Sequence, residues 1–319
     1  MSKLKVGLHF HRWPLGENGG PASPPPTGLA YDSVRTHDGG VQWHNLNPAR
    51  GVYNWSRMDT IVAAQVGKSI VYTLYGTPAF ALLRPTEAQT LDDYGTPGGA
   101  GAANQADVVT FITALLTRYK GRIGAVEIWN EPQFNSVVTP NSSFWGSAAE
   151  LVTMGIGVAM ARNAVDPTVE VWSPGFMGGQ SMKEFLNTGM MTHGRDIVDA
   201  VCVHTYGCAM LLDTSNIVSG WNGVNMTRNV MAGCGIPHKK IVISEHGVGI
   251  NKNDPQLVAF LALPAEQKYA YLFSILVALS GAGVYAWYGY SYDHHDQLLG
   301  DLITPGRPER QAFNDFAAI

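Results

Sequence analysis

Short apolar runs alternate with longer amphipathic segments along the chain. The runs are nearly continuous and rich in β-branched residues, which is typical of parallel strands covered on both faces. They cover Lys5–His11, Ser33–His37, Ser69–Tyr75, Ala125–Asn130, Val169–Ser173, Ala200–Tyr206, Lys240–Glu245 and Gly283–Tyr288. The segments between them repeat apolar residues at spacings of three or four, which predicts amphipathic helices. Examples are Arg57–Val66, Ala106–Tyr119, Trp145–Ala164, Ser181–Thr192 and Ala265–Ser280.

Eight strand-then-helix units predict the α/β class and, within it, a single (β/α)8 TIM barrel. The 319 residues are within the usual size of one such domain, so residues 1–319 are assigned to one barrel. Two segments rich in proline and glycine, Pro14–Thr27 and Thr86–Asn104, follow strands. In a barrel both would lie at the carboxyl ends of the strands, where long loops shape a cleft.

Composition and charge narrow the range of partners. The net charge is −4 and no basic stripe is present, so the sequence does not favour a nucleic-acid partner. No apolar run reaches the roughly 18 residues that cross a membrane. The N-terminal segment enters a strand at once and lacks the features of a signal peptide. We therefore expect a cytoplasmic protein or one released without a signal peptide, by lysis or in a phage particle, unless a leader has been removed. The oligomeric state is not predicted.

Two glutamates follow strands at matching points of the predicted barrel. Strand four reads AVEIWNEP, and its proline ends the strand directly after Glu131. Strand seven reads KIVISEHG and ends at Glu245. Both carboxylates should therefore point across the same barrel mouth, where barrel enzymes hold their chemistry. Such a pair serves glycoside hydrolysis, in which one carboxyl protonates the leaving oxygen and the other attacks the anomeric carbon.

With these motifs the chain resembles clan A of the glycoside hydrolases. That resemblance implies retention of configuration, Glu131 as general acid/base, Glu245 as nucleophile, a carbohydrate substrate, and neither a metal nor an organic cofactor. Two features are similar to families 39 and 42. Strand two is followed by the segment VQWHNLNPARGVYNWSRMD, and strand three ends without a histidine, in TLYGTPAF. The exact family stays open.

Further residues match clan positions one at a time. Arg35, in SVRTHD, matches the arginine that binds the nucleophile, and Asn130 matches the residue that binds the sugar 2-hydroxyl. The resemblance implies that Tyr206 donates to Glu245, and that His204 orients the acid side of the cleft. Other aromatic residues are candidates for sugar contact: Trp287 as the floor of the subsite for the reacting sugar, and Trp43, Tyr75, Trp55, Trp145 and Trp221 for stacking.

Two other functions stay open. His9 and His11 lie two residues apart on strand one and could share an ion with His204, as in a metal-dependent amidohydrolase-type barrel; Asp293 and the run after it add possible ligands. That set is incomplete, because strand five offers no histidine. The second alternative is a barrel that binds carbohydrate without cleaving it.

The three cysteines, Cys202, Cys208 and Cys234, have no CxxC spacing. They are interpreted as free thiols, with a Cys208–Cys234 bridge as the alternative. The sequence leaves open the sugar, the linkage, and whether cleavage is internal or terminal.

Overall fold

The computed structural model describes residues 3–16, 21–134, 143–193, 197–206, 218–249, 251–293 and 300–319. Its strands are β1 (Lys5–His9), β2 (Ser33–Arg35), β3 (Ser69–Thr73), β4 (Ile123–Glu127), β5 (Glu170–Phe176), β6 (Ala200–Tyr206), β7 (Lys240–Gly247) and β8 (Ala286–Gly289). Each strand pairs in parallel with the next, and β8 pairs with β1 to close the barrel. The predicted (β/α)8 TIM barrel is therefore confirmed.

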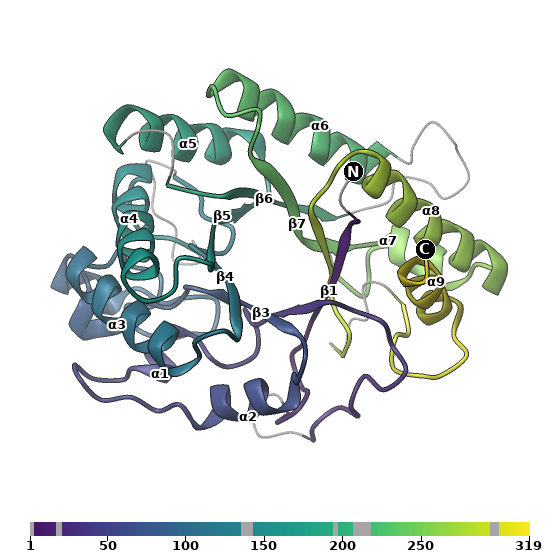
Figure 1. Ribbon diagram of the computed structural model, residues 1–319, viewed down its shortest axis with the longest axis horizontal. Helices are drawn as coiled ribbons and strands as arrows, with labels where there is room; N and C mark the ends of the chain where they lie inside the picture. Colours follow the sequence, from purple (N-terminus) through teal and green to yellow (C-terminus); the bar gives the residue numbers. More distant parts are fainter. Residues whose placement is uncertain are drawn as a thin grey trace.

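Helices surround the barrel on its outside (Figure 1). They are α1 (Trp43–Leu46), α2 (Ser56–Ala64), α3 (Gln105–Arg118), α4 (Ala148–Val165), α5 (Gly179–His193), α6 (Val218–Gly233), α7 (Pro255–Leu261), α8 (Ala265–Gly281) and α9 (Pro308–Ala317), with short 3-10 turns η1 (Ala79–Ala81) and η2 (Pro85–Gln89) after β3. Local sequence sets their starts: Ser147 and Glu150 form a capping box before α4, and Asp254 caps α7. No described helix is long and apolar enough to cross a membrane.

Two apolar clusters hold the strands in place. A small cluster fills the inside of the barrel and includes Trp172, Cys202 and Tyr288. A much larger one lies between the outer faces of the strands and the helices. Both faces of the strands are therefore buried, which explains why the strands appear in the sequence as continuous apolar runs. The buried polar residues discussed below stand out because they gather at the carboxyl ends of the strands.

Candidate active site

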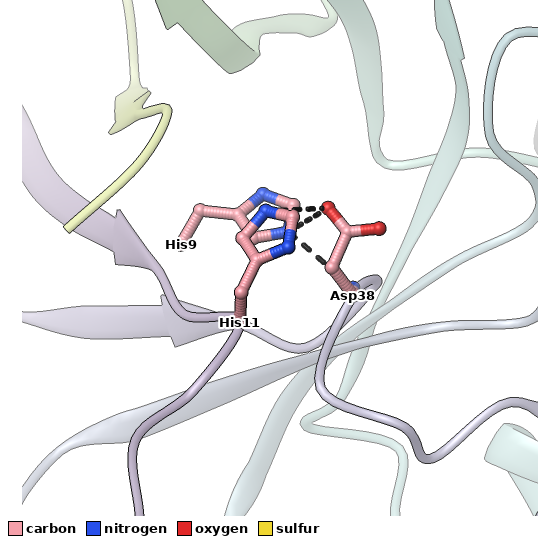
Figure 2. Close-up of side chains that lie close together, drawn as sticks. All are labelled: His9, His11 and Asp38. Carbon is pink, nitrogen blue, oxygen red and sulfur yellow. Dashed lines mark hydrogen bonds and ion pairs between the residues drawn. The ribbon is translucent and has the colours of Figure 1, made fainter. Parts of the chain in front are cut away.

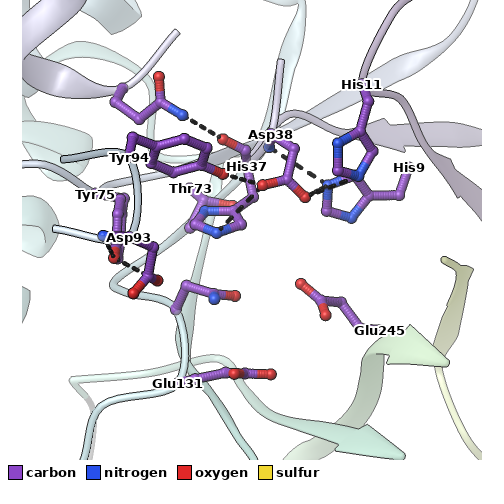
Figure 3. A network of polar contacts seen from close by, with 12 residues as sticks. His9, His11, His37, Asp38, Thr73, Tyr75, Asp93, Tyr94, Glu131 and Glu245 are labelled. Atoms are coloured by element: carbon purple, nitrogen blue, oxygen red, sulfur yellow. Dashed lines mark hydrogen bonds and ion pairs between the residues drawn. The ribbon is translucent and has the colours of Figure 1, made fainter. Parts of the chain in front are cut away.

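Four strands bring the predicted catalytic residues to one end of the barrel. Arg35 is the last residue of β2, and Glu131 follows β4. His204 and Glu245 lie side by side in the register of β6 and β7. Figure 3 shows the carboxylates of Glu131 and Glu245 facing one another across the mouth. One carboxylate oxygen of each and a ring nitrogen of His204 all lie within 4.8 Å of one another.

Glu245 is almost completely buried and is held from both sides. Arg35 donates through Nη1 to Oε1, and the Tyr206 hydroxyl donates to Oε2. Burial by itself would raise the pKa of Glu245, but the positive charges of His204 and Arg35 outweigh burial and lower the pKa to about 2. Glu245 is therefore ionised over the whole neutral range, as a nucleophile must be.

Glu131 has a different environment. About a third of its side chain is exposed, against 5% for Glu245. Its backbone has φ 47°, in the left-handed region, and its N–H donates to the carbonyl of Gly175 at 2.9 Å. The Gly175 N–H donates to the Trp129 carbonyl at 3.0 Å, so β5 fixes the turn that carries Glu131. These two bonds aim the side chain into the mouth.

His204 joins the two carboxylates. Its Nδ1 lies 2.6 Å from Glu131 Oε1 and 3.4 Å from Glu245 Oε2. Burial lowers the pKa of His204, but the negative charges of Glu245 and Glu131 outweigh it and leave the pKa raised. The ring can stay in place because Gly175 has no side chain: a Cβ there would lie 2.1 Å from His204 Nε2.

Arg35 is fully buried and connects three of the residues around the mouth. Besides Glu245 it binds Glu127 Oε2 at 2.7 Å through Nε, and Asn130 Oδ1 at 2.7 Å through Nη2. Glu127 also accepts from the Thr73 hydroxyl at 2.9 Å. Sequence reasoning missed Glu127, although a lone acid inside the otherwise apolar strand AVEIW is a signal for a buried ionic partner.

A second polar cluster lies on the β1–β2 side of the mouth. His9 Nε2 and His11 Nε2 lie 2.8 and 3.1 Å from the same oxygen of Asp38, Oδ2 (Figure 2). The Tyr94 hydroxyl, from the long loop after β3, donates to Asp38 Oδ1. The imidazoles, with His11 as the largest contributor, lower the pKa of Asp38 well below its ordinary value, although burial would raise it. Asp38 and Tyr94 were also missed from the sequence.

The structure does not bring His9, His11 and His204 together around one ion. His204 lies with Glu131 and Glu245, whereas His9 and His11 lie with Asp38. Asp293 accepts the backbone N–H groups of residues 11 to 13 and so holds the chain after β1. The amidohydrolase-type arrangement is therefore not favoured. Residues 294–296, which the sequence offered as further ligands, lie outside the described residues.

The predicted stacking residues separate into two groups. Tyr75 has no exposed surface, but it lies beside the mouth, where its hydroxyl donates to Asp93 Oδ2 at 2.7 Å and its ring meets His37 edge-on. Trp43 and Trp287 have no exposed surface: the first stacks on Phe111, and the second packs against Phe313 of α9. The structure therefore places both rings in the core rather than in the cleft.

The correction at Trp287 follows from strand geometry. Successive side chains of β8 face opposite sides, and Tyr288 takes the inside of the barrel, so Trp287 faces the helices. Tyr290, just after β8, is the ring at the mouth, where it meets His9 edge-on with the ring centroids 4.7 Å apart.

The structure also gives the surroundings of two other aromatic candidates and of two cysteines. Trp55 is half-buried just before α2, where it stacks on Tyr53 and packs against Phe111 of the core. Trp145 is half-buried next to α4, and its backbone bonds to the loop after β3. The side chain of Trp221 lies outside the described residues, as does Cys208. Cys202 and Cys234 are free and buried.

Solved structures share this fold. A family 39 (GH39) β-xylosidase from Caulobacter crescentus superposes with a TM-score of 0.68 at 19% identity, covering 99% of this chain and 71% of that chain. A GH39 enzyme from Xanthomonas axonopodis pv. citri gives 0.67 at 19% identity, covering 91% and 60%. A xylanase from Paenibacillus barcinonensis gives 0.60 at 13% identity, covering 98% and 95%. The predicted resemblance to clan A glycoside hydrolases is thus confirmed in the fold. No protein-family model and no curated protein matches the sequence.

Proposed function

We propose that the chain is a retaining glycoside hydrolase that cleaves β-glycosidic bonds of an oligo- or polysaccharide. One observation carries this proposal: oxygens of Glu131 and Glu245 lie within 4.8 Å of one another. Retaining enzymes hold their two carboxyl groups about 5–5.5 Å apart, whereas inverting enzymes leave about 6.5–9.5 Å for a water molecule. The observed spacing is on the short side of these two ranges, so it supports direct attack by a carboxylate.

The environments of the two glutamates support a division of roles. Glu245, ionised and fixed by Arg35 and Tyr206, attacks the anomeric carbon. Glu131, which is more exposed, protonates the departing glycosidic oxygen. A covalent glycosyl-enzyme forms, and Glu131 then takes a proton from the water that releases the sugar. Both steps use the same proton position on Glu131.

Other residues around the pair have supporting roles in this proposal. Asn130, which accepts from Arg35 at 2.7 Å, binds the sugar 2-hydroxyl in this proposal, a contact that strengthens in the transition state. His204 holds Glu131 in position. Tyr290, which is half-buried, contributes an aromatic wall at the mouth.

The substrate screen begins from the names of the structural neighbours, which are β-xylosidases and xylanases as well as a glucosidase. The chain spans 60% of the Xanthomonas enzyme and 71% of the Caulobacter enzyme, so the activity of those whole proteins is a starting point for this chain only. Aryl β-xylosides and β-glucosides are the first substrates to test, followed by xylan fragments.

Two substitutions test the proposal on the best substrate found. Glu245→Gln should abolish nearly all turnover, because the neutral amide cannot attack. Glu131→Ala should slow substrates with poor leaving groups far more than activated aryl glycosides, because only the former need protonation. Glu184→Gln, an exposed glutamate on α5, is the matched control and should change nothing. Equal losses on both substrate classes in Glu131→Ala would contradict its acid role. Undiminished hydrolysis in Glu245→Gln would refute the whole assignment.

A further inference from the structure

We propose that His9, His11 and Asp38 bind one divalent transition-metal ion of the Zn²⁺ class, at a site separate from the two catalytic glutamates. Neither the hydrolase proposal nor the comparisons require this site, and its test does not depend on activity. The ligands would be Nε2 of both imidazoles and Oδ2 of the carboxylate. Figure 2 shows these three groups converging on one point between β1 and the end of β2.

The positions of the three ligand atoms are close to those of a zinc site. The two Nε2 atoms lie 2.8 and 3.1 Å from Asp38 Oδ2, and all three atoms lie within 4.8 Å of one another. Bond lengths of about 2.0–2.2 Å in a tetrahedron put neighbouring ligand atoms roughly 3.3 Å apart. The two nitrogen–oxygen distances therefore need to open by only a few tenths of an ångström to admit an ion. Local sequence produces this arrangement, because residues two apart in an extended chain face the same side.

The surroundings provide support for the ligands and a path for the ion. The Tyr94 hydroxyl donates to the other oxygen of Asp38 and so fixes the direction of the carboxylate, a contact typical around bound metals. His11 and Asp38 also border a partly open pocket of about 470 Å³, whose wall includes Gln42 and His44. A water molecule from this pocket can complete a four-coordinate site.

The charges around the three ligands are of both signs. Asp38 supplies a carboxylate, and Arg35 Nη1 lies 3.4 Å from His9 Nδ1. An ion on His9 Nε2 needs a neutral ring that carries its proton on Nδ1, so this contact with Arg35 has to open when the ion binds. The bond between the ion and the Asp38 carboxylate has to offset that cost.

The experiment measures binding of Zn²⁺ to the full chain after treatment with chelator and dialysis. Calorimetry should show one ion bound per chain, and Co²⁺ in its place should give the strong visible absorption of a four-coordinate site. His11→Ala and His11→Gln should weaken binding by more than the roughly 10- to 100-fold that loss of an outer hydrogen-bond partner costs. The glutamine variant retains a hydrogen-bonding side chain beside Asp38, which makes it the safer of the two for folding.

Two control variants locate the ion. His44→Ala removes another imidazole from the same pocket, one that lies near Asp92 rather than Asp38, and should leave Zn²⁺ binding unchanged. Glu131→Gln alters the other group of potential ligands, Glu131, His204 and Glu245, and should also leave it unchanged. Wild-type affinity in both His11 variants would overturn the proposal. So would a wild-type chain that binds no Zn²⁺ at millimolar concentration, or binding that Glu131→Gln abolishes and His11→Gln does not.

Discussion

Replacing Gly175 with alanine tests how the barrel positions Glu131, the proposed acid. The new Cβ would lie 2.1 Å from His204 Nε2 and 2.9 Å from two ring carbons. Because ordinary contacts between such atoms are about 3.5–4.0 Å, the ring has to move by more than about 1 Å. Such a movement breaks the 2.6 Å contact between His204 and Glu131. A hydrogen bond to a charged group contributes about 1.5–3 kcal/mol.

That energy sets the expected effect on rate. At 1.36 kcal/mol for each factor of ten, kcat on poor leaving groups should fall by about 10- to 150-fold in Gly175→Ala. The loss on activated aryl glycosides should be smaller, because Glu131 matters less there. Gly178→Ala is the matched control: it lies just after the same strand, and a Cβ there meets nothing within 4 Å. Unfolding temperatures, measured in parallel, separate a loss of stability from a loss of positioning.

A double-mutant cycle decides whether the effect passes through His204. In a His204→Ala background the ring is gone, so adding Gly175→Ala should leave kcat unchanged within about twofold, because the two substitutions act through the same contact and are not additive. If Gly175→Ala instead lowers kcat as much in that background as in the wild type, the glycine acts on the backbone of Glu131 rather than through the imidazole. The steric reasoning would then be wrong.

Two further predictions concern single side chains. Tyr206→Phe removes a hydrogen-bond donor to Glu245, whose lowered pKa of about 2 keeps it ionised in acid. The pKa of Glu245 should therefore rise. At 1.36 kcal/mol per pH unit, the acidic limb of the pH–activity profile should move up by about one pH unit or more. An unchanged limb would show that Tyr206 does not stabilise the carboxylate. Trp43→Ala should lower the free energy of unfolding by about 3–5 kcal/mol in denaturant titrations, because the ring is buried against Phe111. A stable variant that loses only substrate affinity would show that Trp43 contacts the substrate instead.

The sequence was sufficient to predict the barrel and many of the residues that meet at its mouth. Eight parallel strands produce eight apolar runs, and a proline or glycine near the end of a run marks where the side chains leave the core. That is why Glu131 and Glu245 were both located at strand ends, and the structure brings them together with Arg35, His204 and Tyr206. Their roles in catalysis are proposals that the substitutions above test.

The sequence could not predict which side of the sheet a side chain faces in a strand that is apolar on both faces. The run VYAWYGY offers aromatic rings on both sides, so nothing in it says whether Trp287 or Tyr288 faces the barrel interior. The start of β8 also differs, since the strand begins at Ala286 rather than at residue 283. Contacts made by loops were equally hidden. Tyr94 reaches Asp38 from a segment 56 positions away, and no local pattern encodes such a meeting.

The backbone at Glu131 has a consequence for engineering this protein. Glu131 is the only non-glycine residue with positive φ among those that the structure describes. A side chain in that conformation costs about 1–2 kcal/mol, and glycine removes this cost at an expense of about 0.5–1 kcal/mol in unfolded-state entropy. Glu131→Gly removes the strain but also loses the 2.6 Å contact with His204, which contributes about 1.5–3 kcal/mol, so the two effects largely offset one another. A screen for heat resistance alone would therefore hardly register the loss of the proposed acid, so any thermostabilisation campaign needs a turnover screen at every round.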